Sequence, residues 1–320
     1  MKTDSEVEEY GLPAQKAMMV WRHRSMEKQI ADASTSIRRW WWEYLRLSKD
    51  YWLLCKTCEP GQPVTNDEAL AKIFCDFGNI YDCTFEDWWR RTGSKLFEER
   101  QLPPTVVEIT SLESYATVER TGKILVEIPL QLTLETVQKQ ILRILEGYSD
   151  KRPTNRLEYS SSKYPITVAL NRLEVLKKTH AVYCLHRELI DKPKALHRLG
   201  FSKEQSEYET RADLFRIGVA MKLSVKNERL IGTEEEIHRK LRNVRSDVSR
   251  FIARGQELLA NVERGEFAKY GEPEPPPPRF SSAQDAVHLK LEEEWWSLDL
   301  NSSLNGKRID DARRIHYSGD

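Results

Sequence analysis

Residues 234–266 read EEEIHRKLRNVRSDVSRFIARGQELLANVERGE, and this stretch indicates one long amphipathic helix. Apolar side chains recur there every three or four residues, apart from Gly255, and this is the spacing of one face of an α-helix. Arg239, Arg250 and Arg254 fall on the opposite side. The apolar positions are Ile237, Leu241, Val244, Val248, Ile252, Leu259 and Val262.

Helical spacing also marks most of the remaining chain. Ser34 is a suitable N-cap for a tryptophan-rich helix that we expect to run to Cys58, before the helix-breaking residues Glu59-Pro60-Gly61. N-cap residues and apolar stripes predict further helices at about 67–78, 84–97, 133–148, 166–190, 193–200 and 205–223.

One segment has the alternation of a strand instead. Residues 113–120 and 123–130 flank Thr121-Gly122, and apolar residues alternate along the second run, which predicts a β-hairpin. We therefore expect a mainly helical α+β fold, in which Trp-rich N-terminal helices and the hairpin pack with a C-terminal helical bundle. The expected segments are 1–150, a basic helical region at 151–269, and a flexible Pro-rich and acidic tail at 270–320, with one composite domain favoured over two.

Length and composition fit a folded, soluble protein. The chain has 320 residues, of which 39% are hydrophobic and 31% are charged, so it has enough apolar side chains for a core. We find no apolar run long enough for a membrane helix and no signal peptide at the N-terminus, and we expect a cytoplasmic protein without membrane contact. Its net charge is zero, but Lys and Arg exceed Asp and Glu in 151–260, which suggests an acidic partner.

Local motifs of catalysis are absent from the sequence. It contains no P-loop, no dinucleotide-binding glycine motif, no H-E-x-x-H and no G-x-S-x-G, and its seven histidines are scattered. We expect no cofactor and favour a protein without enzymatic activity. An enzyme of unrecognised type stays open, because sites assembled from distant residues leave no local motif.

Two groups of basic residues are candidates for contact with DNA or RNA. The predicted helix 234–266 is rich in arginine, a residue suited to phosphate contacts that do not depend on base sequence. Elsewhere arginine pairs adjoin tryptophans, a combination that can hold a phosphate while an indole stacks on a base. The candidates are Arg239, Lys240, Arg242, Arg245, Arg250 and Arg254 in the helix, with Arg38, Arg39, Arg90 and Arg91 beside the tryptophans.

The alternative function is that of an interaction or scaffold protein. The apolar stripe of helix 234–266 and the tail residues Trp295, Trp296 and Leu298 would then bind another protein or a second copy of the chain. The acidic residues around these tryptophans suggest a further role, in which the tail folds back over the basic face and competes with nucleic acid.

Four cysteines are candidate zinc ligands, since Cys55 and Cys58 form a C-x-x-C and Cys75 and Cys83 follow. Seven residues separate the second pair, which is more than a zinc knuckle uses. We therefore expect free cysteines and no metal.

Several short stretches carry a family resemblance. They are Asp76-Phe77-Gly78-Asn79-Ile80, Phe85-Glu86-Asp87-Trp88-Trp89, Gly93 with Leu96-Phe97, residues 124–130 (ILVEIPL) and Leu214-Phe215-Arg216-Ile217-Gly218. In these stretches the chain resembles uncharacterised proteins carried on bacterial phage-like and integrative mobile elements, over roughly residues 40–265. The resemblance implies a bacterial cytoplasm and a mobile-element or defence context, and it assigns no role to any residue.

Overall fold

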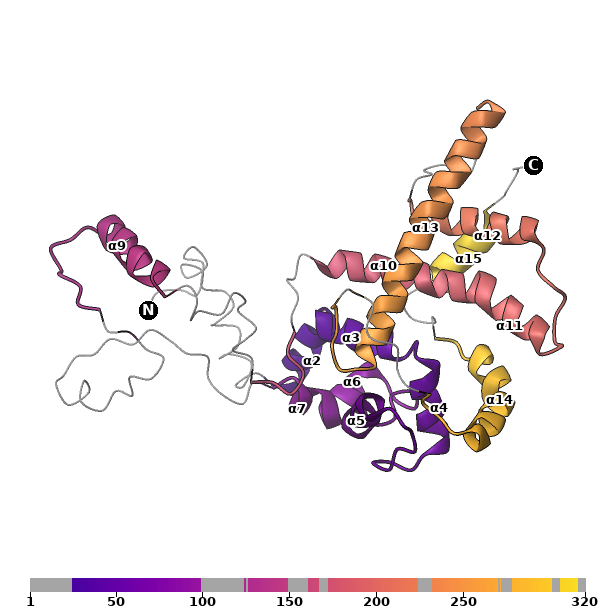
Figure 1. Cartoon of the computed structure of the whole chain (residues 1–320), viewed down its shortest axis with the longest axis horizontal. Helices are drawn as coiled ribbons and strands as arrows, with labels where there is room; N and C mark the ends of the chain where they lie inside the picture. Colours follow the sequence, from indigo (N-terminus) through magenta and orange to yellow (C-terminus); the bar gives the residue numbers. More distant parts are fainter. Residues whose placement is uncertain are drawn as a thin grey trace. The chain divides into compact units, whose positions relative to one another are not determined.

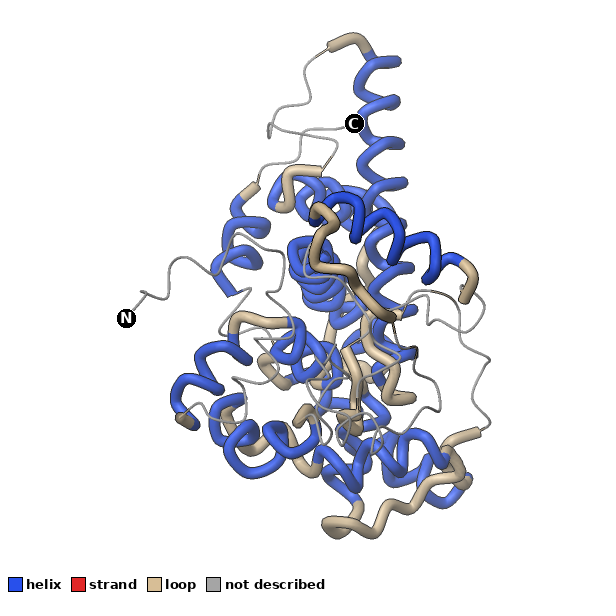
Figure 2. The backbone as a smooth tube through the Cα atoms, turned by 90° about the vertical axis from the view of Figure 1, so that its left-hand side faces the viewer, coloured by secondary structure: helices blue, strands red, loops and turns tan. Residues whose placement is uncertain are grey.

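The computed structural model describes residues 25–98, 124, 126–148, 161–166, 172–223, 232–269, 271, 278–300 and 306–315. Every regular element in these ranges is a helix, as Figure 2 shows, so the described fold is all-α. The prediction of an α+β fold is therefore wrong. Part of the predicted hairpin, 113–120 and its turn, lies outside the described residues, while residues 126–130 form no strand. The alternating residues there bury no face, since Val126 and Ile128 are 38% and 45% exposed.

The chain divides into two compact units. One comprises Met1–Val20 and Glu99–Pro165, and its described helix is α9, Leu134–Glu146, which Thr133 caps as predicted. No side chain of α9 is buried. The other unit comprises Trp21–Glu98 and Ile166–Asp320 and contains all the remaining described helices.

The N-terminal part of this second unit is built from short helices. The predicted helix 34–58 is broken in two at Ser48, because the Ser48 hydroxyl accepts a hydrogen bond from the Tyr51 amide and starts a new helix. The helices are α2 Met26–Ser34, α3 Ile37–Leu45, α4 Lys49–Thr57, α5 Glu68–Phe77, α6 Phe85–Trp88, the π-helix η2 Trp89–Gly93 and α7 Ser94–Leu96 (Figure 1).

Tryptophan rings form the centre of this part. Trp41, Trp52, Trp88 and Trp89 are all fully buried, and the Trp88 indole donates to the Phe77 carbonyl at 2.9 Å. Gly93 makes this packing possible, because a Cβ there would lie 2.6 Å from the Trp88 ring. The tryptophans adjoining the arginine pairs are therefore core residues.

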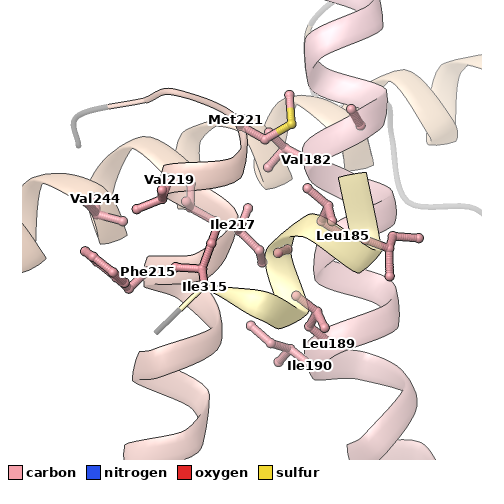
Figure 3. Close-up of a cluster of buried hydrophobic side chains, with 14 of the residues drawn as sticks. Val182, Leu185, Leu189, Ile190, Phe215, Ile217, Val219, Met221, Val244 and Ile315 are labelled. Atoms are coloured by element: carbon pink, nitrogen blue, oxygen red, sulfur yellow. The ribbon is translucent and has the colours of Figure 1, made fainter. Parts of the chain in front are cut away.

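The C-terminal part is a bundle around a second core (Figure 3). Side chains of α10, α12, α13 and α15 meet there, among them Leu185, Phe215, Val244 and Ile309. The helices are α10 Leu173–His186, the π-helix η6 Arg187–Asp191, α11 Lys192–Arg198, α12 Glu207–Ala220, α13 Glu234–Val262, α14 Ser282–Ser297 and α15 Gly306–Arg314.

The helix α13 joins the two parts, because it contacts α10 and α12 as well as α3 (Figure 1). Two glycines allow its close approach to the bundle. A Cβ on Gly218 of α12 would lie 2.5 Å from Val244, and one on Gly255 would lie 2.7 Å from the Tyr183 ring of α10. The glycine that interrupts the apolar stripe of α13 is thus a packing position.

The prediction of a flexible tail is corrected by α14 and α15. Ser281 and Gln284 form a capping box that starts α14, and Trp295 of this helix is only 3% exposed. In α15 the side chains of Ile309 and Ala312 belong to the core of the bundle. The tail prediction failed because Pro-rich composition near 273–278 says nothing about helices that begin after it.

Replacing Gly255 with Ala tests the close contact between α13 and α10. Alanine favours an isolated helix by about 1 kcal/mol over glycine, but overpacking a core costs about 1–3 kcal/mol. We expect Gly255→Ala to lower the free energy of unfolding by about 1–2 kcal/mol in urea titrations. The control Gln256→Ala, at the next and exposed position, should stay within about 0.5 kcal/mol. A more stable Gly255→Ala variant would contradict the packing described here.

Candidate nucleic-acid interface

The exposed side of α13 carries most of the basic residues predicted for this helix. Thr233 and Glu236 form a capping box at its start, and Val244, Val248 and Gly255 are buried on the side that faces the bundle. Arg239, Arg242, Arg250 and Arg254 are exposed and lie on the other side. We call these four residues the arginine face. The structure thus brings together four of the six arginines and lysines predicted in this helix.

The two other predicted residues of α13 lie beside this face. Lys240 is half-buried, and Arg245 is exposed. The pKa of Glu207 on α12 is lowered mainly by Arg211 and to a smaller extent by the charge of Arg245, so Arg245 lies near that carboxylate. Between Ile237 and Gln256 the sequence has a single acidic residue, Asp247, which forms an ion pair with Arg250. The arginine face therefore has a strong excess of positive charge.

Three short polar residues on the exposed side were not singled out from the sequence. Asn243, Ser246 and Ser249 are exposed between the two ends of the arginine face. Helical phase would have identified Asn243 and Ser246, each four residues from an arginine of the face, and Ser249, three residues from Ser246. They leave the space between the arginines free of bulky side chains.

The arginines beside the tryptophans have other surroundings. Arg39 forms an ion pair with the buried Glu43 at 2.5 Å, and its guanidinium lies 4.9 Å from the centre of the Trp42 ring. Burial raises the pKa of Glu43, while the charges of Arg39 and Arg46 act in the opposite direction. Arg39 therefore neutralises a buried carboxylate and packs against the aromatic core.

Arg38, Arg90 and Arg91 remain at the surface to different degrees. Arg38 is half-buried, and Arg90 and Arg91 are exposed on η2. The neighbouring rings of Trp88 and Trp89 are buried, so they offer no surface on which a base could stack. The predicted combination of phosphate contact and base stacking is not formed at these positions.

The predicted partner-binding residues of the tail contact the chain itself. Trp295 packs against Trp52 of α4, with ring centres 5.6 Å apart, and Leu298 is half-buried. The guanidinium of Arg187 lies 5.0 Å from the ring centres of both Trp295 and Trp296, and it donates a hydrogen bond to the Trp295 carbonyl. The helix α14 of the tail therefore packs on α4 and α11, and α15 packs on α12.

Arg279 fixes the start of this tail segment. Its guanidinium forms ion pairs with Asp50 at 2.6 Å, Asp67 at 3.0 Å and Glu263 at 2.8 Å. The Ser48 hydroxyl donates to Glu263 at 2.5 Å. Burial raises the pKa of Glu263, and the positive charge of Arg279 opposes that shift. One side chain thus connects α4, the start of α5, the end of α13 and the segment before α14.

The four candidate zinc ligands do not form a metal site. Cys75 is exposed, whereas Cys55, Cys58 and Cys83 are half-buried, and burial raises the pKa of the Cys55 and Cys83 thiols. In the part of the chain that the structure describes, no group of three or more His, Cys, Asp or Glu side chains has the arrangement of a metal centre.

One histidine and one cysteine lie close together in the interior. The Sγ of Cys184 is 3.5 Å from Nδ1 of His180, and both side chains are buried. Burial lowers the pKa of His180 to about 3, and its ring packs edge-on against Trp40 and Tyr44. A neutral imidazole with no access to solvent cannot accept a proton from a substrate, so this pair is part of the core.

Replacing Arg279 tests its role in holding the tail. Breaking a buried ion pair by removing one partner costs about 3–5 kcal/mol, so we expect Arg279→Met to lower the free energy of unfolding by about that amount. The control Arg254→Met changes an exposed arginine and should stay within about 0.5 kcal/mol. If Arg279→Met fails to fold, the milder Asp50→Asn variant gives the answer, because it removes only one of the three carboxylates. Equal stability of Arg279→Met and Arg254→Met would show that the cluster contributes nothing.

The buried His180 predicts a loss of stability in mild acid. Below about pH 6.5 the unfolded chain takes up a proton on this histidine that the folded chain does not, so the stability falls as the pH falls towards 3. Between about pH 7.5 and pH 5, His180→Phe should lose about 2 kcal/mol less than the unaltered chain does. The exposed Gln256, which carries no titratable group, provides the control, and Gln256→Phe should follow the unaltered chain. Parallel profiles for all three proteins would refute the assignment.

None of the described helices has the length and apolar composition needed to cross a membrane. No protein-family model, curated protein or solved structure matches the chain. The resemblance to proteins of mobile elements stays a prediction, and the case for the arginine face depends on its geometry and charge.

Proposed function

We propose that the protein binds nucleic acid, without catalysing a reaction, through phosphate contacts of the arginine face. The observation that supports this most is the division of α13 into two sides. Its apolar side packs against α10, α12 and α3, whereas the other side is exposed and carries Arg239, Arg242, Arg250 and Arg254. Among the described residues Arg239, Arg242 and Arg254 have no carboxylate partner, so their charges are available to phosphates.

Contacts of this kind are insensitive to base sequence. Phosphate groups are the same at every nucleotide, and most protein contacts to them fix position without reading bases. The proposal includes a cytoplasmic location, and a mobile-element or defence context would be compatible with it.

The structure supports the scaffold alternative less, because the side chains that would bind a partner are buried within the folded unit. Val244, Val248 and Val262 of the apolar stripe are buried within the unit, and Trp295 is buried against Trp52. A partner could reach these side chains only if helices of the folded unit separated.

Charge reversal on α13 tests the proposal. The triple variant Arg239→Glu, Arg242→Glu and Arg250→Glu should bind labelled DNA or RNA at least about tenfold more weakly, because three phosphate contacts are replaced by repulsion. The slope of log K against log salt should become shallower by about 2.7 for duplex DNA. Fluorescence anisotropy over a series of salt concentrations measures both quantities.

A matched control separates a local effect from net charge. Lys72, Lys95 and Lys139 are exposed lysines on α5, α7 and α9, and changing all three to Glu alters the net charge by the same amount. This control should keep most of the affinity, and circular dichroism should show that both variants are folded. Unchanged binding by the α13 variant, or an equal loss in both variants, would overturn the proposal.

A further inference from the structure

The spacing of the arginine face divides it into two pairs. Arg239 and Arg242 lie near one end, and Arg250 and Arg254 lie near the other. At 1.5 Å per residue, the midpoints of the two pairs are about 17 Å apart along the helix axis. This distance is close to that between the two phosphate backbones that border the major groove of B-DNA, which is about 12 Å wide between its edges.

The residues between the pairs fit the same arrangement. Ser246 lies at the middle of the exposed side, with Asn243 and Ser249 on either side of it, and all three are exposed. Their short side chains would let the helix enter the groove, and their polar groups can form hydrogen bonds with base edges or water. A bulky or apolar side chain at Ser246 would hold the two arginine pairs away from the phosphates.

Acidic residues limit the arginine face at both ends. Glu235 is exposed four residues before Arg239, and Glu257 follows Arg254 by three residues, where its carboxylate accepts a hydrogen bond from the Gly271 amide. Both acids lie on or near the same side of α13 as the arginines. The arginine face is therefore about as long as one groove of DNA is wide. It is too short to follow a nucleic-acid backbone over many nucleotides.

The diameter of α13 limits which grooves of a nucleic acid the helix can enter. An α-helix with its side chains is about 10–12 Å across, so it fits the major groove of B-DNA but not the minor groove, which is about 6 Å wide. The major groove of duplex RNA is too narrow for side chains to reach its floor. Binding of a single strand depends on aromatic side chains on which bases stack, and the exposed side of α13 has no Phe, Tyr or Trp.

The surrounding structure leaves room for such an approach. The bundle packs on the side of α13 that bears Val244 and Val248, and the first ten residues of the helix, 234–243, bury no side chain. Figures 1 and 2 both show this end of α13 extending beyond α10 and α12. A duplex can therefore meet the arginine face without a rearrangement of the described helices.

We propose that α13 crosses the major groove of duplex DNA, with Arg239 and Arg242 at one phosphate backbone and Arg250 and Arg254 at the other. This inference rests on the proposed function, and it adds the form of the nucleic acid and the orientation of the helix. Glu235 then lies just outside the first backbone and weakens binding by repulsion.

Variants of the two pairs test the contacts. Arg239→Gln with Arg242→Gln, and Arg250→Gln with Arg254→Gln, should each make the salt slope for duplex DNA shallower by about 1.8, and the four changes together by about 3.6. Glu235→Gln should strengthen binding several-fold. The control Lys72→Gln with Lys95→Gln, on α5 and α7, should leave the slope unchanged. A slope that responds to only one pair would overturn the two-backbone arrangement.

Phosphate ethylation interference on the full chain tests the orientation. We expect two short clusters of sensitive phosphates, one on each strand, facing each other across one major groove, and each pair variant should abolish one cluster. Equal affinity for single-stranded DNA or duplex RNA, or clusters across a minor groove, would overturn this inference and leave the proposed function intact. Absence of binding to all three nucleic acids at low salt would overturn both.

Discussion

The larger unit of the chain depends on the ion pairs that Arg279 forms with Asp50, Asp67 and Glu263. Removal of three carboxylates from water is unfavourable unless a cation and hydrogen bonds compensate them. Arg279 and the Ser48 hydroxyl meet that requirement only where α4, α5 and the end of α13 converge. The same contact fixes the C-terminal end of α13, while the glycine contacts at 218 and 255 fix its path across the bundle. The exposed side of α13 is thus held in place by interactions on its other side and at its end.

The same residue type has two different roles in this protein. Arg39, Arg187 and Arg279 lie against aromatic rings or carboxylates of their own chain, where they replace the water that those groups would otherwise bind. The four arginines of the arginine face differ because their side chains are exposed. An arginine has a structural role where its neighbours are buried, and it is available to a ligand where they are not. The local sequence around the arginine does not distinguish these two cases.

Sequence patterns predicted the features that depend on residues close together in the chain. The start of α13 at Glu234 and the cap of α9 at Thr133 follow from hydrogen bonds that span three residues. The break at Ser48 was missed because the apolar spacing continues across it, and only the distant Glu263 shows what the hydroxyl binds. The packed tail was missed for the same reason, since Lys49 and Glu292 are 243 residues apart. Alternation of apolar residues predicted a strand over 123–130, but residues 126–130 form none, since alternation alone does not supply the pairing that a strand requires.

The long separation of these contacts has a consequence for synthesis of the protein. Trp41 and Tyr44 pack against Phe267, and Trp52 packs against Trp295, so the aromatic core near the N-terminus is completed by residues near the C-terminus. Chains emerge from the ribosome N-terminus first, and contacts between distant residues form late. For most of the time of translation, the nascent chain therefore exposes large indole surfaces that its own later residues will cover.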